Sequence, residues 1–379
     1  RSPGYPLFNP NLIKAKKAGV EISSPMKLFF QLCPTKNIIG VTGSKGKGTT
    51  SSLVYEILKK ATITPNPSLG RRGIFLGGNI GTAPFEFLEK IKPKDWVVLE
   101  LSSFQLEDMD VSPHIAVVTN LFKEHLAPAD PNNPNYHNSI KNYWAAKANI
   151  FAHQENRDWL VMNEKLKSKL SLRAKRSNLV VAARHGIASS LTLPRNDRNI
   201  IFYDKSELAS NLTGEHNKEN VAATEAVAKI LKIKPAIIAQ AVKKFQGLPH
   251  RLEFVAEING VKYFDDSFAT VPDVSVIALK AVGDSNNTPR PRGAATPLER
   301  GIILLAGGAD KGSDFKNFAR EIIKHVKYLI LFKGKGTDRL IKQISNFKSQ
   351  ISVVDNMKAA VRIAKNKSAA GDTVLLSTG

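Results

Sequence analysis

The sequence has little of what marks secreted or membrane proteins. Its 379 residues include a single cysteine, Cys33, which excludes an intrachain disulfide and fits a reducing cytoplasm. No apolar run approaches the length of about 18 residues that crosses a bilayer, and no signal peptide is present. We therefore expect a cytoplasmic protein without membrane insertion. The chain begins at Arg1 rather than methionine, which we interpret as a missing N-terminal part.

Acidic residues are also scarce. There are 33 of them against 55 lysines and arginines, which gives a net charge of +22. The lysines are spread along the whole chain, however, and no basic motif interleaved with aromatic residues occurs. This pattern favours small anionic substrates over a nucleic-acid partner.

The most informative stretch is NIIGVTGSKGKGTTSSLVYEILKKA, residues 37–61. A short apolar run predicts a buried strand, and the later apolar residues fall on one helical face. The glycines between them allow backbone N–H groups and the helix N-terminus to face phosphate oxygens. Lys47 would add a mobile positive charge, and Thr49 or Thr50 a hydroxyl for Mg²⁺. The predicted ATP-binding residues are Gly43, Ser44, Lys45, Gly46, Lys47, Gly48, Thr49 and Thr50.

The spacing departs from the strict GxxxxGK[ST] pattern, because Gly48 follows the lysine where a hydroxyl residue is usual. A Gly/Lys-rich surface turn is the alternative interpretation. The flanking strand and helix favour nucleotide binding.

Strands and helices alternate from Asn37 onwards, which predicts an α/β fold with a parallel, doubly wound sheet. In the first half we expect strands at 37–41, 96–101, 115–119 and 159–162, with helices at 49–61 and 142–152. Helices at 215–230 and 235–245 follow, and a second α/β domain comes after the linker GLPHR at 247–251. In that domain we expect strands at 261–264, 302–306, 328–332, 351–354 and 373–377, and helices at 314–325, 338–347 and 357–366.

Three domains are predicted. Residues 1–36, with a helix at 11–18 and a strand-like VEI at 20–22, are interpreted as the remnant of an N-terminal domain. Residues 37–246 form the central P-loop domain, and 247–379 form a C-terminal Rossmann-like domain whose C-terminus is incomplete. Two basic segments, about 172–199 and 286–300, resemble surface insertions. A basic binding surface is the alternative for both.

Several polar residues stand where a ligand would bind such a sheet, beyond the carboxyl ends of its strands. Glu100 closes the apolar run WVVL, where a buried carboxylate needs a cation. Metal ligation explains it, with a lysine partner as the alternative. His125 follows another strand and is either a second metal ligand or an exposed loop histidine. Lys147 alone would be a solvated helix lysine, and the turn GGNIG at 77–81 is equally consistent with a structural loop.

At this point the motifs LELSSFQLE, GEHNKEN, GLPHRLE and GGADKGSDF converge on one family. The chain resembles the Mur ligases, the ATP-dependent amino-acid ligases of peptidoglycan synthesis, from about Ser2 to its last residue. Among them it looks most like the member that adds D-glutamate to UDP-N-acetylmuramoyl-L-alanine. The N-terminal domain that grips the UDP moiety is largely missing from the sequence, so the chain looks like a fragment.

The resemblance implies that ATP and Mg²⁺ are the cofactors. Lys47 and its loop would bind the ATP phosphates, and Glu100 and His125 would hold Mg²⁺. Lys147 matches the lysine that these enzymes carbamylate, which turns a cation into an anion that supports a second metal ion. The further residues implied on the nucleotide side are Asn217, Asn220, Arg251 and Asp266.

The resemblance also implies residues on the substrate side. Asn79 matches the asparagine of the GGNIG turn, Ser102 lies in LELSSFQLE, and Thr270 and Lys311 would meet the incoming glutamate. The implied partners are the two small-molecule substrates, UDP-N-acetylmuramoyl-L-alanine and D-glutamate, with no nucleic acid, and we expect a monomer.

Two departures keep alternatives open. GKGT in the loop is closer to the folylpolyglutamate synthases, a sister group, and Phe268 replaces the lysine of the family's DSKATN. The alternatives are a folylpolyglutamate synthase-like or other Mur-type ligase, or a nucleotide-binding remnant without catalysis. The LSSFQLE stretch argues against a folylpolyglutamate synthase.

Overall fold

The computed structural model describes residues 1–63, 70–122, 124–126, 135–171, 191–192, 199–269, 271–284, 301–308, 314–345, 347 and 350–378. These residues form two compact units. The first comprises residues 1–211 and 216–245, and the second comprises 212–215 and 246–379. Most of the predicted insertion at 172–199 and all of the one at 286–300 lie outside the described residues.

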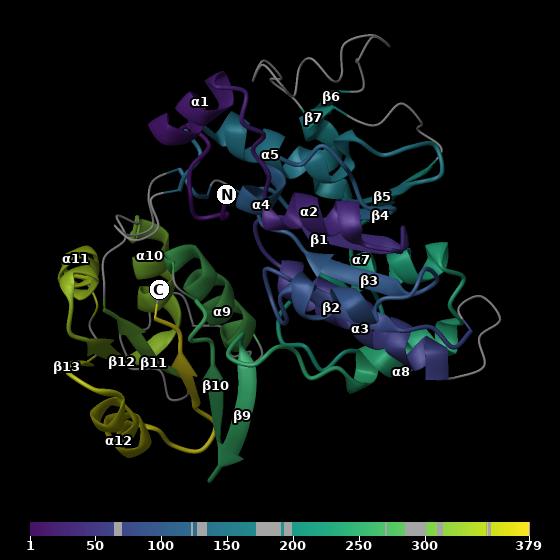
Figure 1. Ribbon diagram of the computed structural model, residues 1–379. Helices are drawn as coiled ribbons and strands as arrows, with labels where there is room; N and C mark the ends of the chain where they lie inside the picture. The colour runs from purple at the N-terminus through teal and green to yellow at the C-terminus, as the bar shows by residue number, and fades with distance from the viewer. Residues whose placement is uncertain are drawn as a thin grey trace. The chain divides into compact units, whose positions relative to one another are not determined.

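The first unit is built on a parallel sheet of six strands in the order β2-β3-β1-β4-β5-β8 (Figure 1). Its strands are β1 (Ile38–Thr42), β2 (Ile74–Gly78), β3 (Trp96–Glu100), β4 (Ile115–Val118), β5 (Trp159–Asn163) and β8 (Ile200–Tyr203). The central strands are short apolar runs buried along their whole length, as expected for a parallel sheet covered on both faces. The carboxyl ends of β1, β3 and β4 therefore meet at one edge.

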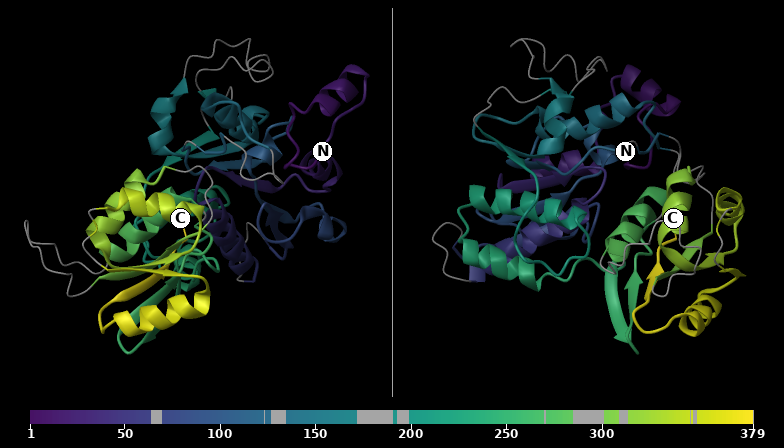
Figure 2. Two further views of the ribbon diagram at one scale, coloured as in Figure 1. Left: turned by 90° about the vertical axis from the view of Figure 1, so that its left-hand side faces the viewer. Right: turned by 180° about the vertical axis from the view of Figure 1, so that it is seen from behind.

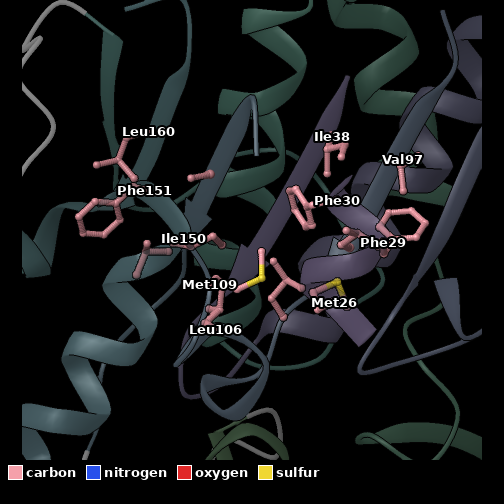
Figure 3. Packing of buried hydrophobic residues seen from close by; sticks show 14 of the residues in the cluster. Met26, Phe29, Phe30, Ile38, Val97, Leu106, Met109, Ile150, Phe151 and Leu160 are labelled. Atoms are coloured by element: carbon pink, nitrogen blue, oxygen red, sulfur yellow. The ribbon is translucent and has the colours of Figure 1, made fainter. Parts of the chain in front are cut away.

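Helices cover both faces of this sheet. On one face lie α3 (Lys47–Ile63), α7 (His216–Ile230) and α8 (Pro235–Lys244), which contact one another. On the other face lie α2 (Pro25–Leu32), α4 (Ser103–Leu106) and α5 (Ile140–Ala152). Figure 3 shows Phe29 and Phe30 of α2 and Ile150 and Phe151 of α5 packed over alternate strand residues such as Val97. Successive strand residues point to opposite faces, so each strand contributes to both layers.

The second unit contains a mixed sheet in the order β13-β12-β11-β14-β10-β9, in which only the β9–β10 pair is antiparallel. Its strands are β9 (Glu253–Ile258), β10 (Val261–Asp265), β11 (Ile302–Gly307), β12 (Val326–Phe332), β13 (Gln350–Val354) and β14 (Thr373–Leu376). Its helices are α9 (Pro272–Asp284), α10 (Lys316–His325), α11 (Lys335–Gln343) and α12 (Met357–Lys367). In the left view of Figure 2 the sheet lies between yellow α12 on one face and α9 and α10 on the other.

The α/β fold class and the parallel central sheet are confirmed. The predicted strands and helices of both halves are present, with their ends shifted by up to four residues. The predicted strand at 20–22 is wrong, because this segment has no regular structure, and it leads from α1 (Pro10–Lys17) into α2. The sequence analysis also did not predict α2, α4, β2, β8, β9 and α9. Among the described helices, none is long and apolar enough to cross a membrane.

Candidate functional site

The loop between β1 and α3 contains two glycines at positions where a residue with a side chain would not fit. Gly43 has a φ of +146°, and a Cβ added there would lie 1.9 Å from Thr119 Oγ1. Gly46 has a φ of +80°, and its added Cβ would lie 2.2 Å from Asn220 Oδ1. The loop therefore approaches β4 on one side and α7 on the other too closely for side chains.

Asn220 is held in this position by its neighbours. Its Nδ2 donates to Asn217 Oδ1 at 2.8 Å, and its Oδ1 accepts from Thr50 Oγ1 at 3.4 Å. Asn217, Asn220 and Thr50 are all buried, whereas Thr49 is partly exposed. The start of α7 is thus packed against the loop, although the two segments are about 170 residues apart in the chain.

Two lysines converge on one carbonyl of the loop. Lys47 Nζ donates to Gly43 O at 3.0 Å and to Ser44 O at 2.9 Å, and Lys147 Nζ donates to the same Gly43 O at 2.8 Å. Lys147 is only 3% exposed, so the prediction of a solvated helix lysine is wrong. The reason is that α5 packs on the sheet with Lys147 on its inner side, which the spacing of polar residues did not reveal.

The environment of Lys147 favours the neutral amine. Burial lowers the pKa of Lys147 well below its ordinary value, and the nearby Lys47 ammonium lowers it further, against the opposing effect of Glu124 and Glu100. Its Nζ also lies 4.9 Å from the centre of the Tyr143 ring. A neutral buried amine is a nucleophile, which a solvated lysine at neutral pH is not.

Glu100 ends β3 beside the loop and is 1% exposed. Asn79 Nδ2 donates to its Oε1 at 2.9 Å, so its hydrogen-bond partner is an amide and not a lysine. No donor among the described residues reaches its Oε2, which is also buried. The GGNIG turn is therefore not simply a loop: Gly77 and Gly78 belong to β2, and the Asn79 N–H donates to Glu100 O at 2.8 Å.

His125 follows β4 in an extended loop with a φ of +55°, and its side chain is exposed. The protein around the ring nevertheless lowers the pKa of His125 to about 4, first by partial desolvation, with a further contribution from the Lys47 ammonium. The imidazole is therefore neutral at pH 7 and able to donate a lone pair to a metal ion.

A cluster beside His125 was not anticipated from the sequence. Tyr143 is fully buried, its hydroxyl lies 2.7 Å from Ser44 Oγ in the loop, and its ring contacts those of His125 and His137. His137 Nε2 lies 3.0 Å from Ser103 Oγ, and burial is the main cause that lowers the pKa of His137 to about 4. Tyr143 lies four residues before Lys147, so the helical spacing was the one available signal.

Ser102, predicted on the substrate side, is the N-cap of α4. Its Oγ accepts from Gln105 N at 3.2 Å, and Gln105 Oε1 accepts from Ser102 N at 2.9 Å. This capping box fixes the start of the short helix that follows Glu100.

Arg251 and Asp266 belong to the second unit. Asp266 accepts from Leu252 N and Ser377 Oγ, and burial raises its pKa to about 6. The Arg251 guanidinium lies 5.4 Å from the centre of the Phe268 ring. Thr270 and Lys311 lie outside the described residues.

A further group in the second unit was also missed. His250, Glu253 and Asp265 present ligand atoms that all lie within 4.8 Å of one another. His250 Nδ1 lies 2.7 Å from Asp265 Oδ2, and this contact raises the pKa of His250. Glu253 and Asp265 are opposed across β9 and β10, and the backbone N–H of His250 donates to Glu253 Oε2 at 2.7 Å.

The donor set at the sheet edge fits a divalent cation. The unpaired Glu100 Oε2 is costly to bury without a positive partner, and carboxylate and hydroxyl oxygens are the ligands that Mg²⁺ prefers. His125 offers a neutral imidazole, which Mg²⁺ uses less often. The carboxylate, the imidazole and the glycine-rich loop thus lie together at the carboxyl edge of the sheet.

Comparison with known proteins gives the same family in both units. The Mur ligase middle domain matches residues 41–228, and the Mur ligase glutamate ligase domain matches residues 250–378. A UDP-N-acetylmuramoylalanine–D-glutamate ligase of Clostridium botulinum is 36% identical over 386 aligned positions, which cover 100% of this chain and 76% of that protein. The ligase of the same name from Clostridium acetobutylicum is 35% identical with the same coverage.

Solved structures share the fold at low identity. The MurF ligase of Thermotoga maritima in complex with ADP superposes with a TM-score of 0.60 at 18% identity, over 94% of this chain and 79% of that one. Escherichia coli FolC in complex with ADP gives a TM-score of 0.57 at 16% identity, over 98% of this chain and 95% of that one. At these identities the likeness concerns the fold alone.

Proposed function

Because the chain belongs to the Mur ligase family of ATP-dependent amide ligases, we propose that it joins D-glutamate to UDP-N-acetylmuramoyl-L-alanine. The observation that carries this proposal is the identity of 34–36% along the whole chain to ligases of that name. The proposed cofactors are ATP and Mg²⁺, and the proposed partners are these small molecules alone.

The phosphate loop supplies the proposed nucleotide site. The N-terminus of α3, which begins at Lys47, provides backbone N–H donors for phosphate oxygens. Lys47 Nζ now donates to two carbonyls of its own loop, and rotation about its side chain would bring it to the phosphates instead. Asn220 contacts the same loop, which supports its assignment to the nucleotide side.

The acid and imidazole at the sheet edge supply the proposed metal site. Glu100 and His125 would hold Mg²⁺, with Thr49 as a further candidate ligand from the loop. The metal ion would neutralise charge on the phosphates during transfer. Asn79 orients the Glu100 carboxylate and leaves its second oxygen for the metal.

Lys147 is proposed to carry a carbamate. The lowered pKa supports this, since the neutral amine attacks CO₂, forms the N–C bond and releases one proton. The resulting anion would replace the neutral amine, and the nearby Lys47 ammonium would then attract it instead of repelling a cation. It would lie next to the loop, where Lys147 Nζ already contacts Gly43 O.

The proposed reaction has two steps. The carboxylate of UDP-N-acetylmuramoyl-L-alanine attacks the γ-phosphorus of ATP, which forms an acyl phosphate and releases ADP. The amine of D-glutamate then attacks the acyl carbon, and phosphate leaves from the tetrahedral intermediate. The contribution of the chain is positioning and charge neutralisation by Lys47 and the loop N–H groups. On the family resemblance, Thr270 and Lys311 are proposed to meet D-glutamate, and Arg251 and Asp266 are proposed to lie on the nucleotide side.

Phosphate release tests the proposal. Release should require both UDP-N-acetylmuramoyl-L-alanine and D-glutamate, and Lys47→Ala should abolish it while Lys59→Ala, on an exposed position of the same helix, should not. A folate acceptor with L-glutamate forms the second arm, because Gly48 follows the loop lysine as in folylpolyglutamate synthases. Release with the folate acceptor alone would overturn the D-glutamate assignment, and no release in either arm would favour a non-catalytic nucleotide-binding protein.

A further inference from the structure

Two residues that follow β4, Thr119 and Asn120, hold the phosphate loop by its backbone. Asn120 Oδ1 accepts from Lys45 N at 2.7 Å, and Asn120 Nδ2 donates to Lys45 O at 2.9 Å. The side-chain amide thus satisfies both backbone groups of one loop residue. Ser44 N donates to Asn120 O at 2.9 Å, and Thr119 Oγ1 donates to Lys45 O at 2.6 Å.

The same segment continues directly into the candidate metal site. Phe122 N donates to Ser44 Oγ at 2.8 Å, and the chain then reaches Glu124 and His125. His125 has a φ of +55°, so its backbone is in a conformation that a free loop would rarely adopt. The loop is therefore fixed relative to residues 119–122, which shortly precede the histidine in the chain.

We propose that Asn120 is a positioning residue that fixes the place of the phosphate loop relative to the metal-binding segment that carries His125. This inference rests on the proposed nucleotide and metal function of the site. Nothing in the contacts of Asn120 requires it to touch either ligand. It acts by holding Lys45, whose peptide group precedes the turn at Gly46.

The physical reason is the geometry of a metal-bridged phosphate. Loop N–H groups and metal ligands act on the same phosphate oxygens, so an error in their separation weakens both sets of contacts. Gly43 permits this close approach, since an added Cβ would collide with Thr119 Oγ1 and lie 3.0 Å from Asn120 N. Loss of the amide would leave Lys45 N without its acceptor and loosen the loop at this residue, while Lys47, Glu100 and His125 stay in the sequence.

The test compares Asn120→Ala with a matched control, Gln154→Ala. Gln154 Nε2 also donates to two carbonyls, Pro113 O at 3.1 Å and Trp159 O at 2.8 Å, but at the amino ends of β4 and β5. Calorimetry with ADP and Mg²⁺ measures affinity without any ligase turnover, and thermal unfolding measures stability in parallel.

We expect Asn120→Ala to raise the Kd for ADP about tenfold, which corresponds to 1.4 kcal/mol, and to weaken Mg²⁺ binding in the ADP complex as well. Gln154→Ala should lower the unfolding temperature about as much as Asn120→Ala does, but its Kd for ADP should be unchanged. If Asn120→Ala does not fold, Asn120→Asp takes its place, because it keeps the acceptor for Lys45 N and replaces the donor to Lys45 O by a charged oxygen. Its Kd is then measured at 0.1 and 0.5 M salt, about the range in which screening removes the effect of an added charge.

An unchanged ADP affinity in Asn120→Ala, or an equal loss in Gln154→Ala, would overturn the inference. So would a loss in Asn120→Asp that disappears at high salt. If the wild-type chain itself binds no Mg-ADP, the proposed function fails and the inference falls with it.

Discussion

Asn79 Nδ2 donates a 2.9 Å hydrogen bond to Glu100 Oε1, and the backbone N–H of the same asparagine donates to Glu100 O at 2.8 Å. The two residues lie at the carboxyl ends of neighbouring strands β2 and β3. Gly78 makes this contact possible, because a Cβ there would lie 2.2 Å from Glu100 O. The carboxylate is thereby fixed, and its second oxygen is left without a donor in the described part of the chain.

Glu100→Gln should keep the strand and the bond to Asn79 but remove the negative charge. We expect ligase activity to fall by at least about a hundredfold, with little rescue by excess Mg²⁺, because a metal ligand contributes charge as well as shape. The measurement is a Mg²⁺ titration of phosphate release, with the exposed Glu155→Gln as the control. Activity close to wild type would remove Glu100 from the metal site.

Lys147 should be carbamylated in the presence of bicarbonate. With ¹³C-labelled bicarbonate we expect a carbamate signal by NMR that is absent from Lys147→Arg and present in Lys59→Arg. Because the pKa of Lys147 is lowered, its neutral, reactive form is already present below pH 10, and its amount falls as the pH drops through the lowered pKa. Activity of Lys147→Ala should be lost and partly restored by a small added carboxylate. A free amine under saturating bicarbonate would contradict the assignment.

Gly46→Ala and Gly19→Ala form a matched pair. Both residues have a φ near +80°, so each alanine carries a left-handed strain of about 1–2 kcal/mol. At Gly19 nothing lies within 4 Å of the added Cβ, whereas at Gly46 it meets Asn220 Oδ1 at 2.2 Å. We expect both variants to lose stability, and Gly46→Ala alone to lose ADP affinity. Calorimetry and urea unfolding check this, and equal ADP affinities would show that the contact with Asn220 is unimportant for the nucleotide.

His137 should make the protein less stable in mild acid. Its pKa falls from 6.5 to about 4 on folding, so the unfolded chain binds the proton more readily and stability is lost as the pH drops from 6.5 to 4. Between pH 7 and pH 5 this amounts to about 2 kcal/mol in the free energy of unfolding. Urea unfolding at the two pH values should show a smaller loss for His137→Gln, which retains a partner for Ser103. The same loss in both proteins would mean that His137 is not the responsible group.

The parts of the fold that depend on local sequence were predictable. The apolar runs at 38–41 and 96–99 predict strands, and the glycines of the loop predict a turn, because these patterns act within a few residues. Helix α2 and strand β9 were missed since neither shows a clear period: α2 is a short helix of mostly apolar residues, and β9 exposes Phe254, Val255 and Ile258. The prediction of a strand at 20–22 was wrong because three residues that alternate between apolar and polar form a strand only where a neighbouring strand pairs with them.

The sequence by itself determined the phosphate loop and the position of Glu100 at a strand end, because both follow from the order of residues along a single βα unit. Only the tertiary structure decided which groups meet there. The strand order β2-β3-β1-β4 is not the order in the chain, and it brings Asn79, Thr119 and Lys147 to the same edge of the sheet. Burial and the charge of Lys47 then change the protonation of Lys147. These effects depend on distances between groups in the folded protein, and such distances cannot be inferred from the order of residues in the sequence.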